Sequence, residues 1–223
     1  MYKSKNEIEK KLKQVKYVYK EISKFKNRIF VKNGLDEETG SYPLLTHIGS
    51  FLAHARSILQ YAQKEAKESG HQSKYDDYVS KNRIIKFFKM IRDSEIHEYT
   101  IGSHMTIAGE SPIVSYDSEA HTAIGKEVKF NVEPLSDLNS PKHKNQEVEI
   151  TLTLGKKINI DSAFIQNLEA GGNKSLAEAA KNGEELYEEQ ECEGEKNIFK
   201  LCENYIIEIE LFINFGITNG FIT

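Results

Sequence analysis

Apolar residues recur at intervals of three and four positions in three segments of the chain, which is the spacing of an amphipathic helix. The first segment covers residues 6–30, where the face opposite the apolar residues is rich in lysine. The second begins near Pro43, a residue tolerated in a first helical turn, and keeps an apolar face as far as Ala62. The third segment, residues 197–215, closes the chain. Each helix has an apolar face to bury, so we expect the last helix to pack against the earlier ones.

A fourth helix, predicted over residues 81–98, differs because apolar side chains cover much of its surface. A helix that is so widely apolar is expected to lie buried among neighbours. Its last turns become polar, and they place Arg92 and His97 five positions apart. The apolar positions of this segment are Ile84, Ile85, Phe87, Phe88, Met90 and Ile91.

The helical spacing stops after His97, where glycine and proline interrupt the chain. Residues 128–132 and 148–154 alternate strictly between apolar and polar side chains, with a polar connector between them. This alternation predicts two antiparallel strands that pair with each other. Residues 175–190 are rich in alanine and glutamate, which predicts a largely exposed helix.

Together these patterns predict a mainly α fold, a bundle of four or more helices with a small antiparallel β insertion before the last helix. We interpret the chain as a single domain, whose length allows an adequate core. The helical core is assigned to residues 5–100 and 195–217, the β-containing insertion to residues 101–172 and an acidic helical segment to residues 173–194.

Charge is distributed unevenly along a chain whose net charge is −4. Residues 1–32 carry eleven Lys and Arg against three Asp and Glu, whereas residues 101–223 carry ten against twenty-one. The net charge argues against a general nucleic-acid coat protein. The basic first helix is open to two interpretations: it lies beside a phosphate-bearing ligand, or its lysines cover the exposed face of an amphipathic helix. We favour the second, because charged residues are mostly exposed.

The sequence predicts a cytoplasmic protein with no membrane attachment, no metal and no cofactor. No apolar run approaches the ~18 residues that span a bilayer, and the N-terminus has no apolar signal region. Cys192 and Cys202 form neither a disulfide framework nor a zinc site. His97-Glu98 lacks the second histidine of a zinc-protease motif, which would fall at Ile101.

Arg92 and His97 are the strongest candidates for chemistry. A permanent cation and a group that titrates near neutral pH, set at the end of a buried helix, suit reactions of a phosphate. His54 and Arg56 of the second helix would line the same cleft if the two helices are neighbours.

A structural interpretation of the same residues stays open. Arg92 would then form an ion pair with Asp76, Asp77 or Glu95, and His97 would only end the helix.

A pair of helices ending in Arg-Asp-x-x-x-His, followed by a β insertion and a closing Leu-Cys-Glu-x-Tyr helix, resembles the HEPN superfamily. The name abbreviates higher eukaryotes and prokaryotes nucleotide-binding. The architecture covers most of the chain, and the specific motif is the six residues from Arg92 to His97. Asp93 stands where asparagine is the commoner residue in such proteins.

The resemblance implies RNA cleavage without a metal, by a homodimer in which two copies of the motif face each other. Arg92 would hold the phosphate and His97 would transfer a proton, while Asp93 would orient a neighbouring side chain. We therefore expect an endoribonuclease of a toxin–antitoxin or defence system, with RNA as substrate and an antitoxin as a further partner. The alternatives are a non-catalytic HEPN-like module that binds nucleotides or a protein, and a structural helical adaptor.

Overall fold

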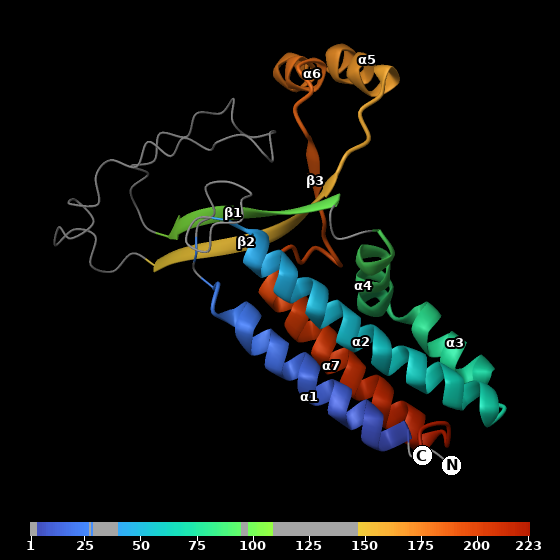
Figure 1. The fold of residues 1–223 in the computed structure, drawn as a ribbon. Coiled ribbons are helices and arrows are strands. Elements are labelled where there is room, and N and C mark those ends of the chain that lie inside the picture. Colours follow the sequence, from blue (N-terminus) through green and yellow to red (C-terminus); the bar gives the residue numbers. More distant parts are fainter. Residues whose placement is uncertain (1–3, 27, 29–39, 95–97, 109–146) are drawn as a thin grey trace. The chain divides into compact units, whose positions relative to one another are not determined.

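The computed structural model describes residues 4–26, 28, 40–94, 98–108 and 147–223 (Figure 1). Over these ranges the chain is mainly α, and a small antiparallel sheet precedes the last helix, as the sequence predicted. The chain forms two compact units. The first unit draws on Met1–Lys26, Tyr42–Glu98 and Glu191–Thr223, and the second on Asn27–Ser41 and Tyr99–Gln190. The first unit contains helices α1 (Ser4–Ser23), α2 (Tyr42–Glu68), α3 (Gln72–Lys81), α4 (Arg83–Asp93) and α7 (Ile198–Thr218).

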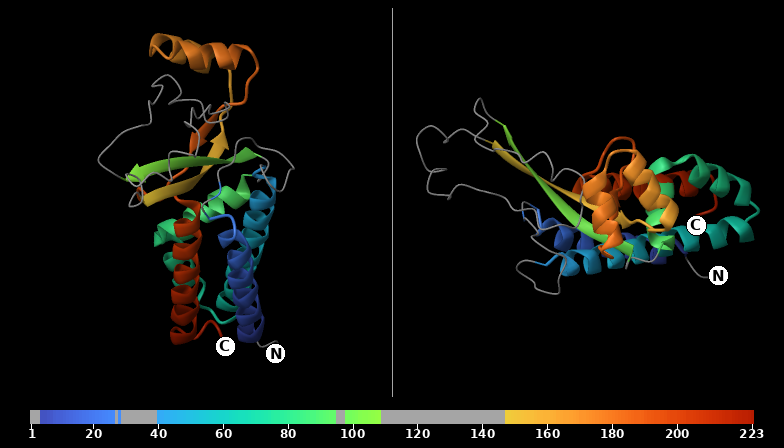
Figure 2. Two further views of the ribbon diagram at one scale, coloured as in Figure 1. Left: turned by 90° about the vertical axis from the view of Figure 1, so that its left-hand side faces the viewer. Right: turned by 90° about the horizontal axis from the view of Figure 1, so that it is seen from above.

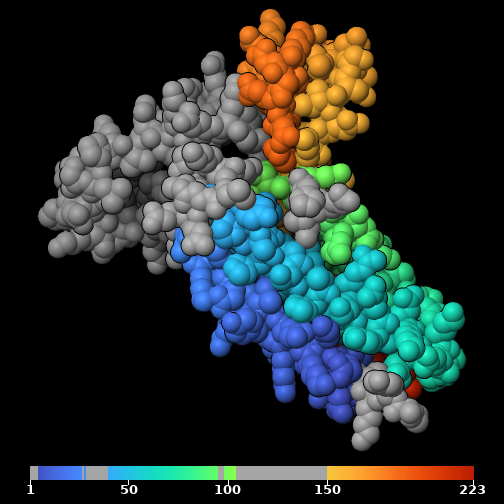
Figure 3. All heavy atoms as spheres, viewed as in Figure 1, coloured from blue at the N-terminus to red at the C-terminus, as the bar shows by residue number. Residues whose placement is uncertain are grey.

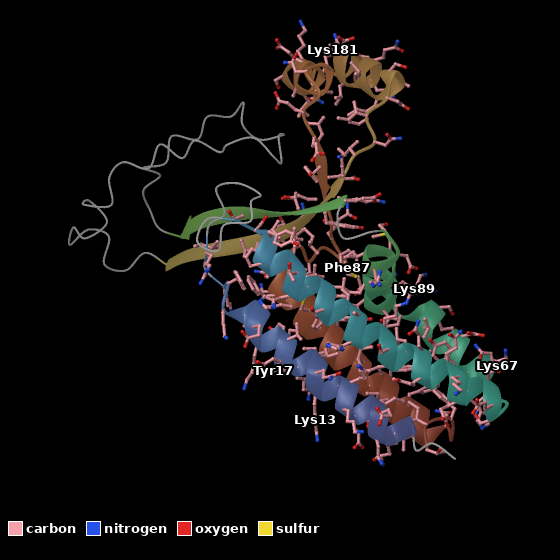
Figure 4. The ribbon with its side chains drawn as sticks, in the orientation of Figure 1. Lys13, Tyr17, Lys67, Phe87, Lys89 and Lys181 are labelled. Carbon is pink, nitrogen blue, oxygen red and sulfur yellow. The ribbon has the colours of Figure 1, made fainter. Side chains whose placement is uncertain are left out.

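Helices α1, α2 and α7 lie side by side along most of their lengths (Figures 1 and 2). Helix α1 buries Ile8, Val15 and Ile22 completely, while most of its lysines are exposed. Lys13 and Tyr17 point away from the neighbouring helices (Figure 4). The lysines therefore cover the exposed face of an amphipathic helix, which is the interpretation that the sequence favoured.

Helix α1 is shorter than the helix predicted over residues 6–30. It ends at Ser23, and three hydrogen bonds of the 3₁₀ type then close a turn through Lys26. Residues 29–39 lie outside the described part of the chain. Helix α2 begins as predicted, with Pro43 in its first turn, and its Ala55 and Ala62 are fully buried.

Three aromatic rings join α2, α4 and α7. Phe88 of α4 stacks on Tyr205 of α7 with 4.4 Å between ring centroids and an interplanar angle of 18°. Phe51 of α2 meets both rings edge-on, at 6.1 Å from Phe88 and 5.9 Å from Tyr205. Burial raises the pKa of the Tyr205 phenol and that of the nearby Cys202 thiol, so both stay protonated at neutral pH. Cys202 is therefore an inert core residue.

The helix predicted over residues 81–98 is shorter in the structure, where α4 covers only Arg83–Asp93. Its side chains at Ile85, Phe88 and Ile91 are buried as expected, but Met90 is 42% exposed. The preceding residues form a separate helix, α3, which the sequence did not distinguish. Asn82 lies between α3 and α4, and its Oδ1 accepts a hydrogen bond from the backbone N–H of Ile85 at 2.9 Å, which caps the start of α4.

The second unit contains the sheet, with strand order β1-β2-β3. The predicted strand at 148–154 is confirmed by β2 (Glu147–Lys157). Its neighbour over this length is β1 (Tyr99–Ala108), which the sequence did not reveal, and Ile101 lies opposite Leu154 in the antiparallel register. The predicted strand at 128–132 lies outside the described residues. On the other side, β3 (Tyr187–Glu189) pairs with the end of β2.

The acidic segment 173–194 was predicted to be helical, and this is wrong for its second half. Helix α6 (Lys174–Lys181) stops at Asn182, and Gly183 follows with a positive φ of 77° that favours glycine. The chain then turns back so that Leu186 packs with alanines of α6 before β3 begins. The partly buried residues around this cluster come mainly from α5 (Ser162–Ala170) and the chain before it: Ile158, Ile160, Phe164, Ile165, Leu168 and Leu176.

A tight contact at the end of α7 gives a test of the helical unit. A Cβ atom at Gly216 would lie 2.5 Å from Ile222 Cδ1 and 2.8 Å from Phe221 Cε2, and both of these side chains are buried. Gly216→Ala should therefore lower the free energy of unfolding by about 1–3 kcal/mol, although alanine favours helices. Urea denaturation followed by circular dichroism measures this, with the exposed Asn214→Ala as a control that should change little. A Gly216→Ala variant as stable as the wild type would contradict the packing described here.

Candidate functional site

Arg56, Arg92 and Asp93 lie together in one pocket between α2 and α4, within the first unit. The pocket has a volume of about 620 Å³. The space-filling view in Figure 3 shows the surfaces of α2 and α4 next to each other. The remaining lining residues are small or polar and come from α2: Ala53, Ser57 and Gln60.

Helical geometry explains why four residues of α2 face this pocket. Ala53, Arg56, Ser57 and Gln60 are spaced by three and four positions, so they share one face of the helix. The apolar residues of α2 lie on other faces and are buried in the bundle. The contact of Phe51 with Phe88 holds α2 against α4, so it fixes the two walls of the pocket.

An ion pair crosses the pocket. Arg56 donates a hydrogen bond through Nη1 to Asp93 Oδ1 at 2.6 Å. The two side chains remain 43% and 48% exposed, so water and salt reach the pair. An exposed pair of this kind contributes only ~0–1 kcal/mol to stability. Asp93 thus orients the side chain of Arg56, and the pair adds more to the geometry of the pocket than to the stability of the fold.

Arg92 forms no ion pair with any residue in the described ranges. Two of the carboxylates proposed as its structural partners are engaged within α3. Asp77 pairs with Lys81 at 2.7 Å, and Asp76 accepts a hydrogen bond of 2.8 Å from the first residue of its own helix. Glu95, the third proposed partner, lies outside the described residues. No residue of the described ranges forms an ion pair with the guanidinium of Arg92, so none of them blocks it from a ligand.

His97 also lies outside the described residues. The structure nevertheless corrects one expectation, that both residues belong to the end of one helix. Helix α4 ends at Asp93, and Ser94 already has an extended backbone with φ −78° and ψ 117°. Helical geometry therefore does not fix the distance between Arg92 and His97.

His54 was expected to line the cleft and is not among the pocket residues. On α2 it lies one position from Ala53, which turns it by about 100° from that side chain. Burial lowers the pKa of His54, and the charge of Lys11 on α1 lowers it further. His54 therefore lies within electrostatic reach of Lys11 on α1, and it is a neutral imidazole at neutral pH.

Sequence reasoning missed Ser57 and Gln60. Their spacing from Ala53 and Arg56 was visible as a small and polar stripe on an otherwise apolar helix, but no motif marked it. The Ser57 hydroxyl donates a hydrogen bond to the backbone carbonyl of Ala53 at 2.9 Å, and its oxygen can still accept one. The side-chain amide of Gln60 is exposed and can donate to a ligand.

The described lining carries two guanidinium groups and one carboxylate, a net charge of +1, which suits a monoanionic ligand such as a phosphodiester. The described residues contain no group of three or more His, Cys, Asp or Glu side chains that would hold a metal ion. None of the described helices is long and apolar enough to cross a membrane. Comparisons of the chain with protein-family models, with curated proteins and with solved structures give no match.

The weak contribution of the ion pair to folding can be measured with a double-mutant cycle. Arg56→Gln, Asp93→Asn and the double variant should each unfold cooperatively, with a coupling energy below about 1 kcal/mol. Urea titrations of the four proteins give this value. A coupling of several kcal/mol would show that the pair is structural, and the pocket would then be a by-product of helix packing.

Proposed function

We propose that this chain is a HEPN-like endoribonuclease that cleaves RNA without a metal, with Arg92 and His97 as its catalytic residues. The observation that carries the proposal is the pocket itself, where Arg92 lies beside a second arginine and has no ion-pair partner among the described residues. A pocket of about 620 Å³ accommodates a phosphodiester with its ribose. The resemblance of the Arg-Asp-x-x-x-His motif to HEPN proteins supplies the reaction and the role of His97.

In the proposed reaction, a neutral His97 accepts the proton of a ribose 2′-hydroxyl. The 2′-oxygen attacks the adjacent phosphorus, and the bond from phosphorus to the 5′-oxygen of the next nucleotide breaks. That oxygen takes up a proton from water, and His97 later releases its proton to solvent, so the products carry a 2′,3′-cyclic phosphate and a free 5′-hydroxyl. Arg92 contacts the non-bridging oxygens and offsets the charge that develops on them.

A second function, binding of a nucleotide without cleavage, is favoured by the end of α4. Helix α4 stops at Asp93, so the geometry of this helix does not by itself set the position of His97 relative to Arg92. The described lining provides cations for a phosphate but no group that titrates near neutral pH. A phosphate site of this composition would bind a nucleotide whether or not His97 completes it.

The resemblance also supports a cellular role and partners for the nuclease. The resemblance to HEPN-like nucleases suggests that the chain acts as a toxin of a toxin–antitoxin or defence system. We therefore propose an antitoxin as a protein partner. Such a partner would be expected to cover the pocket, because blocking Arg92 prevents binding of the phosphate.

The catalytic proposal predicts that His97→Ala and Arg92→Ala each lower the rate of RNA cleavage by roughly 10²–10⁴-fold. Both variants should remain folded, because Arg92 lies at the polar end of α4 and contributes little apolar burial. Cleavage should persist in EDTA, and mass spectrometry of the products should show 2′,3′-cyclic phosphate ends. Asp93→Asn should retain cleavage, since it restores the commoner residue of HEPN proteins.

Matched controls are available for both substitutions. Arg83 lies on the same helix, nine positions or about 13.5 Å before Arg92, and Arg83→Ala should leave the rate unchanged. His71, the residue before α3, is not in the pocket lining, and His71→Ala serves as the histidine control. An undiminished rate in His97→Ala, or no cleavage of varied RNAs by the wild type, would reject the nuclease and leave the nucleotide-binding function.

Assembly gives a separate test. A site that rests on Arg92 and His97 is sparse, and HEPN-like enzymes double it by pairing two copies about a two-fold axis. In such an isologous dimer the same surface of each copy meets its counterpart, so both pockets reach one interface. Light scattering at micromolar concentration should therefore give the mass of two chains. A monomer that persists in the presence of RNA would count against the nuclease.

A further inference from the structure

The ion pair between Arg56 and Asp93 places a negative charge inside a pocket that otherwise suits a phosphate. Both arginines of the described lining, Arg56 and Arg92, have guanidinium groups that match the oxygens of a phosphate or a carboxylate. Asp93 Oδ1 lies 2.6 Å from Nη1 of Arg56 and therefore takes a position that a phosphate oxygen would occupy. In this structure, one of the two arginines of the pocket is paired with a carboxylate of the protein itself.

This contact is exchangeable. The exposures of 43% and 48% mean that neither group is held by a dry environment, so separating them leaves no buried charge. After separation, Asp93 would return to water and Arg56 would keep its position on the pocket face of α2. An incoming phosphodiester would then contact two guanidinium groups that come from two different helices.

We propose that Arg56 is a second phosphate-binding residue, and that Asp93 is a built-in competitor that occupies Arg56 until the phosphodiester of RNA displaces it. The identity of the ligand rests on the proposed function, but the exchange requires no cleavage. The contact is thus autoinhibitory: it lowers the affinity of the empty pocket for weakly held anions and is released by a ligand that also engages Arg92.

The experiment measures binding of a short single-stranded RNA whose 2′-hydroxyls are methylated, so that it cannot be cleaved. Fluorescence anisotropy with the full chain, repeated at several salt concentrations, gives the affinity and its salt dependence. Asp93→Asn should tighten binding by up to about fivefold, the effect of removing an exposed ion pair of ~1 kcal/mol. Arg56→Gln should weaken binding and lower the slope of log K against log salt by about 0.7, the value for one lost phosphate contact.

The chain offers a matched control for the change of net charge. Arg83 and Glu193 form an exposed ion pair of the same type, with 2.9 Å between Nη1 and Oε1, and neither residue lines the pocket. Glu193→Gln removes one negative charge, as Asp93→Asn does, and Arg83→Gln removes one positive charge. Both control variants should bind the RNA within about twofold of the wild type.

The double variant Arg56→Gln/Asp93→Asn decides the mechanism. If Asp93 acts by occupying Arg56, its substitution should tighten binding in the wild type and have little effect once Arg56 is absent. An equal gain in both backgrounds would overturn the proposal, because Asp93 would then act only through its long-range charge. A gain no larger than that of Glu193→Gln would overturn it as well.

The experiment distinguishes failure of the proposed exchange between Asp93 and RNA from failure of the proposed nuclease activity. If the wild type cleaves unmodified RNA while Arg56→Gln and Asp93→Asn bind the methylated RNA like the wild type, the exchange is wrong and the nuclease stands. If no RNA is cleaved but the coupling between the two substitutions is present, the phosphate site stands and the nuclease is rejected. Absence of binding to the methylated RNA by both the wild type and Asp93→Asn would overturn the exchange, whereas the nuclease is decided by cleavage of unmodified RNA.

Discussion

The stacked rings of Phe88 and Tyr205, with Phe51 against both, are the contact on which the rest of the helical unit depends. They bring together three helices from distant parts of the sequence. Large buried aromatic side chains contribute strongly to a core, and their offset and edge-on packing restricts how the helices approach. Helix α4 is short, and a helix of its length is marginal on its own. Its position is therefore determined by this packing.

The pocket follows from the same packing. Its two walls are the faces of α2 and α4 that remain outside the core, so arginines can occupy them without burying charge. Arg56 and Asp93 are 37 positions apart and meet only because the rings hold their helices together. Exposure keeps their contact weak, and a weak contact between opposite charges can be exchanged for a ligand. The core and the pocket thus use different faces of the same two helices.

The sequence predicted those elements whose signal is local. The spacing of apolar residues identified α1, α2 and α7, and strict alternation identified β2. It did not identify β1, where Gly102 interrupts the pattern and the strand is defined by a partner almost fifty positions away. For the site, the chemical types of Arg56, Arg92 and Asp93 were noticed, but not the ion pair, which depends on tertiary packing. The end of α4 at Asp93 was missed because the polar residues that follow are compatible with a helix.

Asn82 connects three helices of the bundle at one position. This residue is both the last residue of the connection from α3 and the cap of α4, and its side-chain amide also donates to Glu208 of α7 at 2.5 Å. The link between the two helices thus has no spare length. An insertion or deletion of one residue here would break the cap of α4 or its link to Glu208, and would change how α4 packs against α2. It would shift Arg92 relative to α2, so over evolutionary time this joint should keep its length even where its neighbours in the chain vary.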